Sequence, residues 1–179
     1  MELKPGLSAI VTGGAAGIGR ALVLALAHKG IFITIIDFSQ DKGIQAASLA
    51  EVQLRKFHTD LKFPPVLFSR CDVSNSSKWA VFGFYAFLRE LVCSDVYFAA
   101  DELAAAFRKH VDTYGGLDIC INCAGIATPI SFYEDQTDGF NSWRRAVDIN
   151  FVAVIESTRL AVWVEVLNWN QFEAAMFAN

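Results

Sequence analysis

The chain has 179 residues and a formal net charge of −4 at pH 7, and its composition is 54% hydrophobic and 19% charged. This length fits one domain with a sizeable core, and the mildly acidic balance gives no electrostatic reason to expect a nucleic acid or an anionic membrane as a partner. The first residues contain no apolar stretch of the kind that a secretory signal needs, and the four scattered cysteines indicate a reduced, cytoplasmic setting.

Strand and helix patterns alternate along most of the chain. Near-continuous apolar runs predict strands that are covered on both faces, and helical spacing of apolar residues separates them. In chain order, the predicted elements are strand Leu7–Val11, helix Ile18–Lys29, strand Ile31–Ile36, helix Asp41–Phe57, strand Val66–Cys71, helix Asp101–Tyr114, strand Leu117–Asn122 and a helix from Phe140 to at least Ala161. This alternation predicts an α/β fold with a doubly wound parallel sheet, here of about four strands in the order 3-2-1-4.

A glycine-rich turn joins the first strand to the first helix. Gly13, Gly17 and Gly19 have the spacing of a dinucleotide turn. Glycines let the backbone approach a pyrophosphate, and the N-terminus of the helix presents unpaired N–H groups to it. Asp37 closes the second strand, where its carboxylate would accept hydrogen bonds from the adenosine ribose and repel a 2′-phosphate. Because the next residue is Phe38 and not an arginine, the motif predicts NAD rather than NADP as the cofactor.

The same residues resemble a known family. The pattern Thr-Gly-x-x-x-Gly-x-Gly from Thr12 to Gly19 is similar to the cofactor turn of the short-chain dehydrogenase/reductase family. Further motifs of that family follow in its order, namely Asp37, Cys71-Asp72-Val73, Asn122-Cys123-Ala124-Gly125 and Asn150. Within that family, the sequences of segments 71–73, 107–112 and 116–119 most resemble those of 15-hydroxyprostaglandin dehydrogenase-like members. The resemblance covers about residues 3–77 and 101–161. It implies the N-terminal part of a Rossmann-like fold and, by descent, an NAD-dependent oxidoreductase of a secondary alcohol or ketone.

The resemblance also implies roles around the cofactor. The amides of 14–19 would hold the pyrophosphate, with Ile18 against the nicotinamide ribose. Asp72 would accept a hydrogen bond from the adenine amino group beside Val73, and the segment 122–125 would line the cofactor after the fourth strand. The expected cofactor-binding residues are Thr12, Gly13, Gly14, Gly17, Ile18, Gly19, Asp37, Phe38, Cys71, Asp72, Val73, Asn122, Ala124 and Gly125. Without the neighbouring motifs, the preferred interpretation of Asp72 would be a helix cap or a turn residue.

The groups that handle a proton in this family are missing. The family uses a tyrosine whose pKa is lowered by a lysine four residues later, together with a serine that orients the substrate. The last lysine, Lys109, and the last tyrosine, Tyr133, both precede Asn150. Asn150 is the one surviving catalytic position, where the family's asparagine helps to hold a water beside the lysine, although it also fits an ordinary polar residue of a helix. We therefore expect the chain itself to be inactive.

Cys120 and Cys123 spell C-x-x-C, but residues three apart on a strand point to opposite faces, which favours a core role for both. Cys123 also stands where the family usually has an asparagine that braces the central strands. We expect the hydroxyl group of Thr12 to brace the turn in its place. No pair of the three histidines has metal-ligand spacing, so the sequence predicts no metal site.

Two stretches fall outside the resemblance. Residues 78–100 form an aromatic-rich insertion without turn residues, which we interpret as translated non-coding sequence or, alternatively, as a lineage-specific helical insertion. Residues 162–179 form an apolar tail that fits continued helix or disordered sequence. The domain prediction is an incomplete dinucleotide-binding domain over 1–161, interrupted by 78–100 and followed by the tail. The fourth strand is then an apolar sheet edge.

The sequence is compatible with several functions. The main prediction is an inactive chain that binds NAD, while the small alcohol or ketone substrate belongs to a full-length relative. One alternative is a homo-oligomer or an isoform that pairs with full-length protein through the helices 101–114 and 140–161 and inhibits it. Another is a mis-spliced product that does not fold stably. None of them involves a nucleic acid or a membrane.

Overall fold

A computed structural model of the chain describes residues 2–75, 102–128, 133–134 and 142–167. Within these residues, four parallel strands form one sheet in the order β3-β2-β1-β4. The strands are β1 (Ser8–Thr12), β2 (Phe32–Asp37), β3 (Val66–Arg70) and β4 (Ile119–Asn122). The order 3-2-1-4 that the sequence predicts is confirmed.

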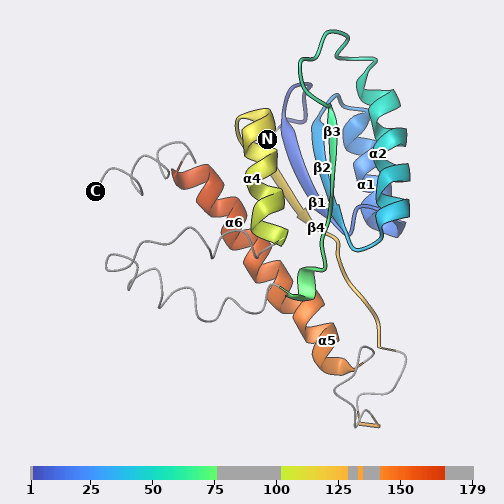
Figure 1. Cartoon of the computed structure of the whole chain (residues 1–179), viewed down its shortest axis with the longest axis vertical. Coiled ribbons are helices and arrows are strands. Elements are labelled where there is room, and N and C mark those ends of the chain that lie inside the picture. The colour runs from blue at the N-terminus through green and yellow to red at the C-terminus, as the bar shows by residue number, and fades with distance from the viewer. Residues whose placement is uncertain (1, 76–101, 129–132, 135–141, 168–179) are drawn as a thin grey trace.

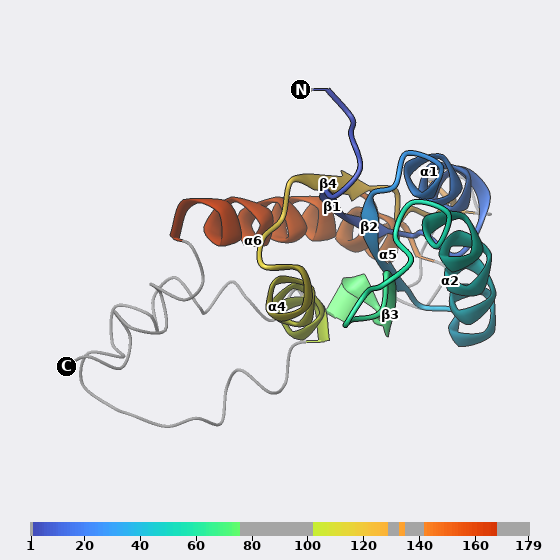
Figure 2. The ribbon, with the colours of Figure 1, turned by 90° about the horizontal axis from the view of Figure 1, so that it is seen from above.

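Helices cover both faces of the sheet (Figures 1 and 2). On one face lie α1 (Gly17–Ala27) and α2 (Gln40–Leu54), and on the other lie α4 (Glu102–Tyr114) and α6 (Ala153–Leu167). The side chains of β1 point alternately to the two faces of the sheet. Ile10 packs in the hydrophobic cluster under α4 and α6, whereas Ala9 and Val11 pack in the hydrophobic cluster under α1 and α2. The doubly wound architecture is therefore confirmed.

The register of the strands brings several polar residues to one edge of the sheet. Thr12 at the end of β1 pairs with Ile36 of β2 and with Asn122 of β4. Asp37 at the end of β2 pairs with Arg70 at the end of β3. Ligands of open α/β sheets bind outside the carboxyl ends of the strands, so this edge positions the site.

The helix after β2 is shorter than the sequence predicts. We expected it to reach Phe57, but α2 ends at Leu54. The amides of Lys56 and Phe57 donate to the carbonyls of Gln53 and Leu54, three residues back, at 3.1 and 3.0 Å. This is the tighter 3₁₀-type pattern common at helix ends, which apolar periodicity does not reveal.

The helix expected from Phe140 onwards is divided into three parts. The described residues begin at 142, so its predicted start lies outside them. After α5 (Trp143–Val147) comes a π-helical turn, η2 (Asp148–Val152), and then α6. The described residues of the predicted helix are helical throughout, but η2, which carries Asn150, is a wider π-helical turn that the sequence did not predict. α6 continues to Leu167, beyond the predicted domain boundary at 161.

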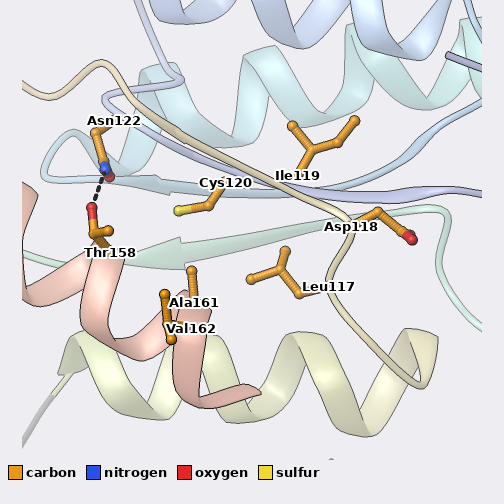
Figure 3. A pocket seen from close by; sticks show the side chains of 8 residues that line it. All are labelled: Leu117, Asp118, Ile119, Cys120, Asn122, Thr158, Ala161 and Val162. Atoms are coloured by element: carbon orange, nitrogen blue, oxygen red, sulfur yellow. Dashed lines mark hydrogen bonds between the residues drawn. The ribbon is translucent and has the colours of Figure 1, made fainter. Parts of the chain in front are cut away.

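β4 forms an edge of the sheet. Among the described residues it pairs with β1 alone, as the sequence predicts, and all of its residues are half-buried. A pocket of about 150 Å³ lies between β4 and α6 (Figure 3). The pocket is lined by Leu117, Asp118, Ile119, Cys120, Asn122, Thr158, Ala161 and Val162.

The insertion 78–100 and the tail from 168 onwards lie outside the described residues, so their interpretation stays a prediction. Within the part of the chain that the structure describes, no helix has the length and the apolar character needed to cross a membrane.

Candidate functional site

The glycine turn packs so tightly that it excludes side chains at two of its positions. Gly13 has φ +66°, and a Cβ atom there would lie 2.6 Å from the amide nitrogen of Ala124. A Cβ atom on Gly19 would lie 2.1 Å from the carbonyl oxygen of Gly13. Contacts this short are not tolerated, so both positions require glycine. The turn is thereby held against the first turn of α1 and against the chain that leaves β4.

The outer side of the same turn is open. Gly17 has φ +52°, and a Cβ atom there would meet nothing within 4 Å. The N-cap residue of α1, Ala16, provides no side-chain hydrogen bond, and the first turn of α1 contains no acidic residue. The first amides of α1 therefore keep their capacity to bind an anion. Ile18, beside them, is 78% exposed. This arrangement fits the pyrophosphate of a dinucleotide.

Asp37 connects the end of β2 to the glycine turn. One carboxylate oxygen, Oδ2, accepts a hydrogen bond from the amide of Ala15 at 3.0 Å, and Oδ1 accepts one from the amide of Ser39 at 2.9 Å. A carboxylate offers about four acceptor positions. The two bonds therefore orient Asp37 and still leave it able to accept hydrogen bonds from ribose hydroxyls.

An arginine that the sequence analysis missed lies beside Asp37. Arg70 is the register partner of Asp37 on β3, and its guanidinium carbon lies 5.8 Å from the centre of the Phe38 ring. The Phe38 ring itself is 54% exposed. Phe38, the chain neighbour of Asp37, gives no sign of this arginine in the sequence. The predicted strand order together with a parallel register would have placed the end of β3 next to Asp37.

Asp72 is engaged in two structural contacts. Its Oδ1 accepts hydrogen bonds from the amide and the hydroxyl group of Ser74, at 3.0 and 2.6 Å, and its Oδ2 lies 3.0 Å from Nη2 of Arg145 on α5. Burial alone would raise the pKa of Asp72, but the bonds from Ser74 and the charge of Arg145 outweigh it, so the pKa lies below its usual value. The bonds to Ser74 match the interpretation of Asp72 as a turn residue. Together with the contact to Arg145, they leave part of Oδ2 free to accept a further hydrogen bond.

The two chain neighbours of Asp72 are less exposed to solvent than Asp72 itself. Cys71 and Val73 are buried, and the amide of Cys71 donates to the carbonyl oxygen of Asp37 at 3.0 Å. This bond holds the ends of β2 and β3 together, so the structure brings Asp37 and Asp72 to the same edge of the sheet.

The chain after β4 is braced by Thr12, as the sequence analysis expects. The amide of Ala124 donates to the Thr12 hydroxyl oxygen at 3.3 Å, and the amide of Cys123 donates to the Thr12 carbonyl oxygen at 3.1 Å. The Asn122 side chain turns away from the glycine turn, because it bonds to Ser157 and Thr158 of α6 (Figure 3). Only the backbone of Asn122 remains available at the edge of the sheet where a cofactor would bind.

Asn150 clamps the same segment from the other side. Its amide group accepts a hydrogen bond from the Ile126 N–H and donates one to the Ile126 carbonyl oxygen, both at 2.9 Å. Asn150 lies in the π-helical turn η2, and a Cβ atom on Gly125 would lie 3.3 Å from its Oδ1. The side chain of Asn150 therefore fixes the loop that follows β4.

Two side chains of α4 with proton-transfer chemistry lie away from this edge. Tyr114 donates its hydroxyl to the Pro64 carbonyl oxygen at 3.0 Å, next to the start of β3, and burial raises its pKa above the usual value. His110 is buried and bonded to Thr34 in the middle of β2. Neither group reaches the end of the strands where a substrate would meet the cofactor.

The cysteines of the described residues are free thiols. Cys71 is buried, whereas Cys120 and Cys123 are half-buried, and burial raises the pKa of Cys120 to about 11. A thiol with a raised pKa is a poor nucleophile and metal ligand. Among the residues that the structure describes, histidine, cysteine and acidic side chains nowhere gather in a group of three or more that could hold a metal ion.

Taken together, the parallel sheet, the glycine turn and the acid at the end of β2 define a dinucleotide-binding domain. A model of the short chain dehydrogenase family matches residues 8–82 and 88–164 of the sequence. The chain belongs to the short-chain dehydrogenase family.

Individual relatives agree with this family. The chain is 31% identical over 159 residues to 15-hydroxyprostaglandin dehydrogenase [NAD(+)] of Macaca fascicularis, and the match covers 88% of the chain and 43% of that protein. It is 30% identical over 162 residues to dehydrogenase/reductase SDR family member 11 of Gallus gallus, covering 90% of the chain and 50% of that protein. The chain thus spans about half the length of these curated relatives.

Solved structures show the same fold. Carveol dehydrogenase from Mycobacterium avium, in complex with NAD, has a TM-score of 0.63 and 20% identity, and the match covers 90% of this chain and 50% of that one. A short-chain dehydrogenase/reductase of Serratia marcescens gives a TM-score of 0.63 and 23% identity, over 90% of this chain and 51% of that one.

Proposed function

We propose that this chain binds NAD at the edge formed by the glycine turn, Asp37 and the segment after β4. The observation that carries the proposal is the bond from the Ala15 amide to Asp37, which fixes the acid and the turn in one unit beside the uncapped N-terminus of α1. A preformed anion site next to a preformed acceptor of ribose hydroxyls suits a dinucleotide. The naming of relatives as NAD(+) enzymes supports this choice of cofactor.

In this proposal, each part of the edge contacts one part of NAD. The amides of Gly14 and of residues 16–19 bind the pyrophosphate, since the Ala15 amide donates to Asp37, and the free acceptor positions of Asp37 bind the adenosine ribose. The free part of the Asp72 carboxylate accepts from the adenine amino group between Phe38 and Val73, while Ile18 packs on the nicotinamide ribose. The backbone of 122–125 lines the remaining side. Bound NAD supplies the hydride acceptor.

We further propose that the family reaction, NAD-dependent interconversion of a secondary alcohol and a ketone, requires residues beyond these 179. That interconversion needs a group that exchanges a proton with the substrate oxygen. The sequence has no tyrosine or lysine after Asn150, which is the one family catalytic position present. The chain by itself would therefore bind the cofactor without turnover. Its cysteine usage favours a cytoplasmic location.

Titration calorimetry with NAD tests the binding proposal. We expect saturable binding by the unaltered chain and about five- to tenfold weaker binding by Asp37→Asn, because a hydrogen bond to a neutral amide oxygen is weaker than one to a carboxylate by about 1–1.5 kcal/mol. The matched control is Asp112→Asn, which removes one exposed carboxylate from α4 on the other face of the sheet. Equal binding by all three proteins would contradict the proposal.

A second function, pairing with another subunit, is favoured by an apolar row along α5, η2 and α6. Val147, Phe151, Ile155 and Val162 are 42, 63, 44 and 49% exposed, and the first three follow at intervals of four residues. Surfaces of this kind mark protein interfaces. We propose that the row docks a second copy or a full-length relative.

Light scattering on the purified chain tests this pairing. A dimer that Phe151→Asp converts to a monomer supports it, with Val52→Asp on α2 as a control because Val52 is also exposed, at 61%. A monomer at all concentrations, with no binding to a full-length relative, would refute it.

A further inference from the structure

Free hydrogen-bonding groups are unevenly distributed at the carboxyl ends of the strands. On the side of the glycine turn, the N-cap residue Ala16 provides no side-chain bond to the first amides of α1, and a Cβ atom on Gly17 would meet nothing within 4 Å. The carboxylate of Asp37 accepts from the amides of Ala15 and Ser39, which leaves about half of its acceptor positions open. Donors for a pyrophosphate and acceptors for ribose hydroxyls are therefore available together on this side.

On the side of β4, the corresponding backbone groups are already bonded within the protein. The amides of Cys123 and Ala124 donate to the carbonyl and hydroxyl oxygens of Thr12, at 3.1 and 3.3 Å. Both polar groups of the Ile126 backbone bond to the side chain of Asn150. These bonds hold the loop after β4 in place, and they reduce what the loop can offer to the polar groups of a ligand.

The side chains on this side offer a ligand few polar contacts. The amide group of Asn122 bonds to Ser157 and Thr158 of α6, away from the glycine turn (Figure 3). Ile18 is exposed and apolar, so its side chain provides contact area and no hydrogen bond. The nicotinamide ring of NAD is positively charged, and the first turn of α1 contains no acidic residue to attract it. Among the described residues, the free polar groups therefore lie at the proposed position of the ADP half of NAD.

We propose that the site recognises the ADP half of the dinucleotide and gains little from the nicotinamide half, so that the chain takes ADP-ribose and ADP as ligands as well as NAD. This inference rests on the proposed function, because it keeps the pyrophosphate at the start of α1 and the adenosine ribose at Asp37. ADP-ribose retains both contacts and lacks the positively charged ring. ADP also lacks the second ribose, but its terminal phosphate is more negative, which the N-terminus of α1 favours.

Titration calorimetry with NAD, ADP-ribose, ADP and nicotinamide mononucleotide tests the inference. We expect the Kd values of NAD and ADP-ribose to agree within about threefold, and the Kd of ADP to lie within about tenfold of that of NAD. Nicotinamide mononucleotide lacks the adenosine and one phosphate, so it should bind at least about a hundredfold more weakly. Asp37→Asn should weaken NAD and ADP-ribose by the same factor, since both place the same ribose there. The matched control, Asp112→Asn on α4, should change neither.

Binding of NAD at least about tenfold more tightly than ADP-ribose would show that the nicotinamide half contributes, and it would overturn this inference while NAD binding stands. Binding of nicotinamide mononucleotide as tightly as ADP-ribose would overturn it in the same way. Failure of the unaltered chain to bind NAD would overturn the proposed function, and this inference with it.

Discussion

Acidification should destabilise this fold through His110, a side chain of α4 with no exposed surface. The ring lies against β2, where its Nδ1 is 2.8 Å from the hydroxyl oxygen of Thr34, and it meets the Tyr114 ring edge-on at 5.0 Å. Burial lowers the pKa of His110 to about 4, against smaller opposing effects of the Gly116 backbone and the charge of Asp118. The folded chain therefore holds His110 neutral.

The size of the effect follows from proton linkage. The unfolded chain binds a proton at His110 with a pKa near 6.5, whereas the folded chain binds it only near pH 4. The stability that depends on neutral His110 is thus fully present above about pH 6.5 and is lost as the pH falls from there towards 4. The loss is about 2 kcal/mol at pH 5 and about 3 kcal/mol at pH 4.

Urea unfolding at pH 7.5 and pH 5, followed by circular dichroism, measures this loss. Between the two pH values the free energy of unfolding should fall by about 2 kcal/mol less in His110→Gln than in the unaltered chain, because glutamine can still bond to Thr34 and does not titrate. His28→Gln is the control, since His28 is exposed at the end of α1. If His110→Gln and the unaltered chain show the same pH dependence, the reasoning about burial is refuted.

Two further changes test the framework around the site. Gly13→Ala should destabilise the fold by about 2–4 kcal/mol, because its Cβ atom would meet the backbone of Ala124 at a positive φ. Gly116→Ala is the control and should cost much less, since a Cβ atom there meets nothing within 4 Å. Equal urea midpoints of unfolding for the two variants would contradict the tight packing at Gly13. Asn150→Ala should cost about 1–3 kcal/mol by removing both bonds to the Ile126 backbone; unchanged hydrogen exchange at the Ile126 amide would show that the clamp does not hold the loop.

The sequence predicted the sheet well because its signals are local. Apolar runs bounded by glycine and proline mark buried strands, and their alternation with helices leaves few topologies open. The observed bounds of β1, Ser8–Thr12, lie one residue beyond the predicted Leu7–Val11. The difference reflects where the ladder of hydrogen bonds begins, which apolar content does not report.

The contacts between distant residues could not be predicted in the same way. Arg70 lies beside Asp37 through the strand register, and Arg145 reaches Asp72 from a helix far along the chain. Asn122 matched a family motif, but its side chain bonds to α6. In each case the tertiary arrangement decides which partner a polar side chain meets, and periodicity carries no information about it.

The π-helical turn is a similar case. Asn150 was expected on a regular helix, and the residue type gave no sign of a wider turn there. Single π-helical turns inside α-helices are frequent at functional sites. Here the turn carries the side chain that bonds to both polar groups of Ile126.

The most direct test of the account is a thermal melt of the purified chain with and without NAD. We expect one cooperative transition that NAD raises, by roughly 5–10 °C at a hundredfold excess over Kd, which corresponds to about 2.7 kcal/mol. The rise should shrink in Asp37→Asn. A melt without a cooperative transition, or one that NAD does not move, would contradict the claim that the glycine turn and Asp37 form a working cofactor site.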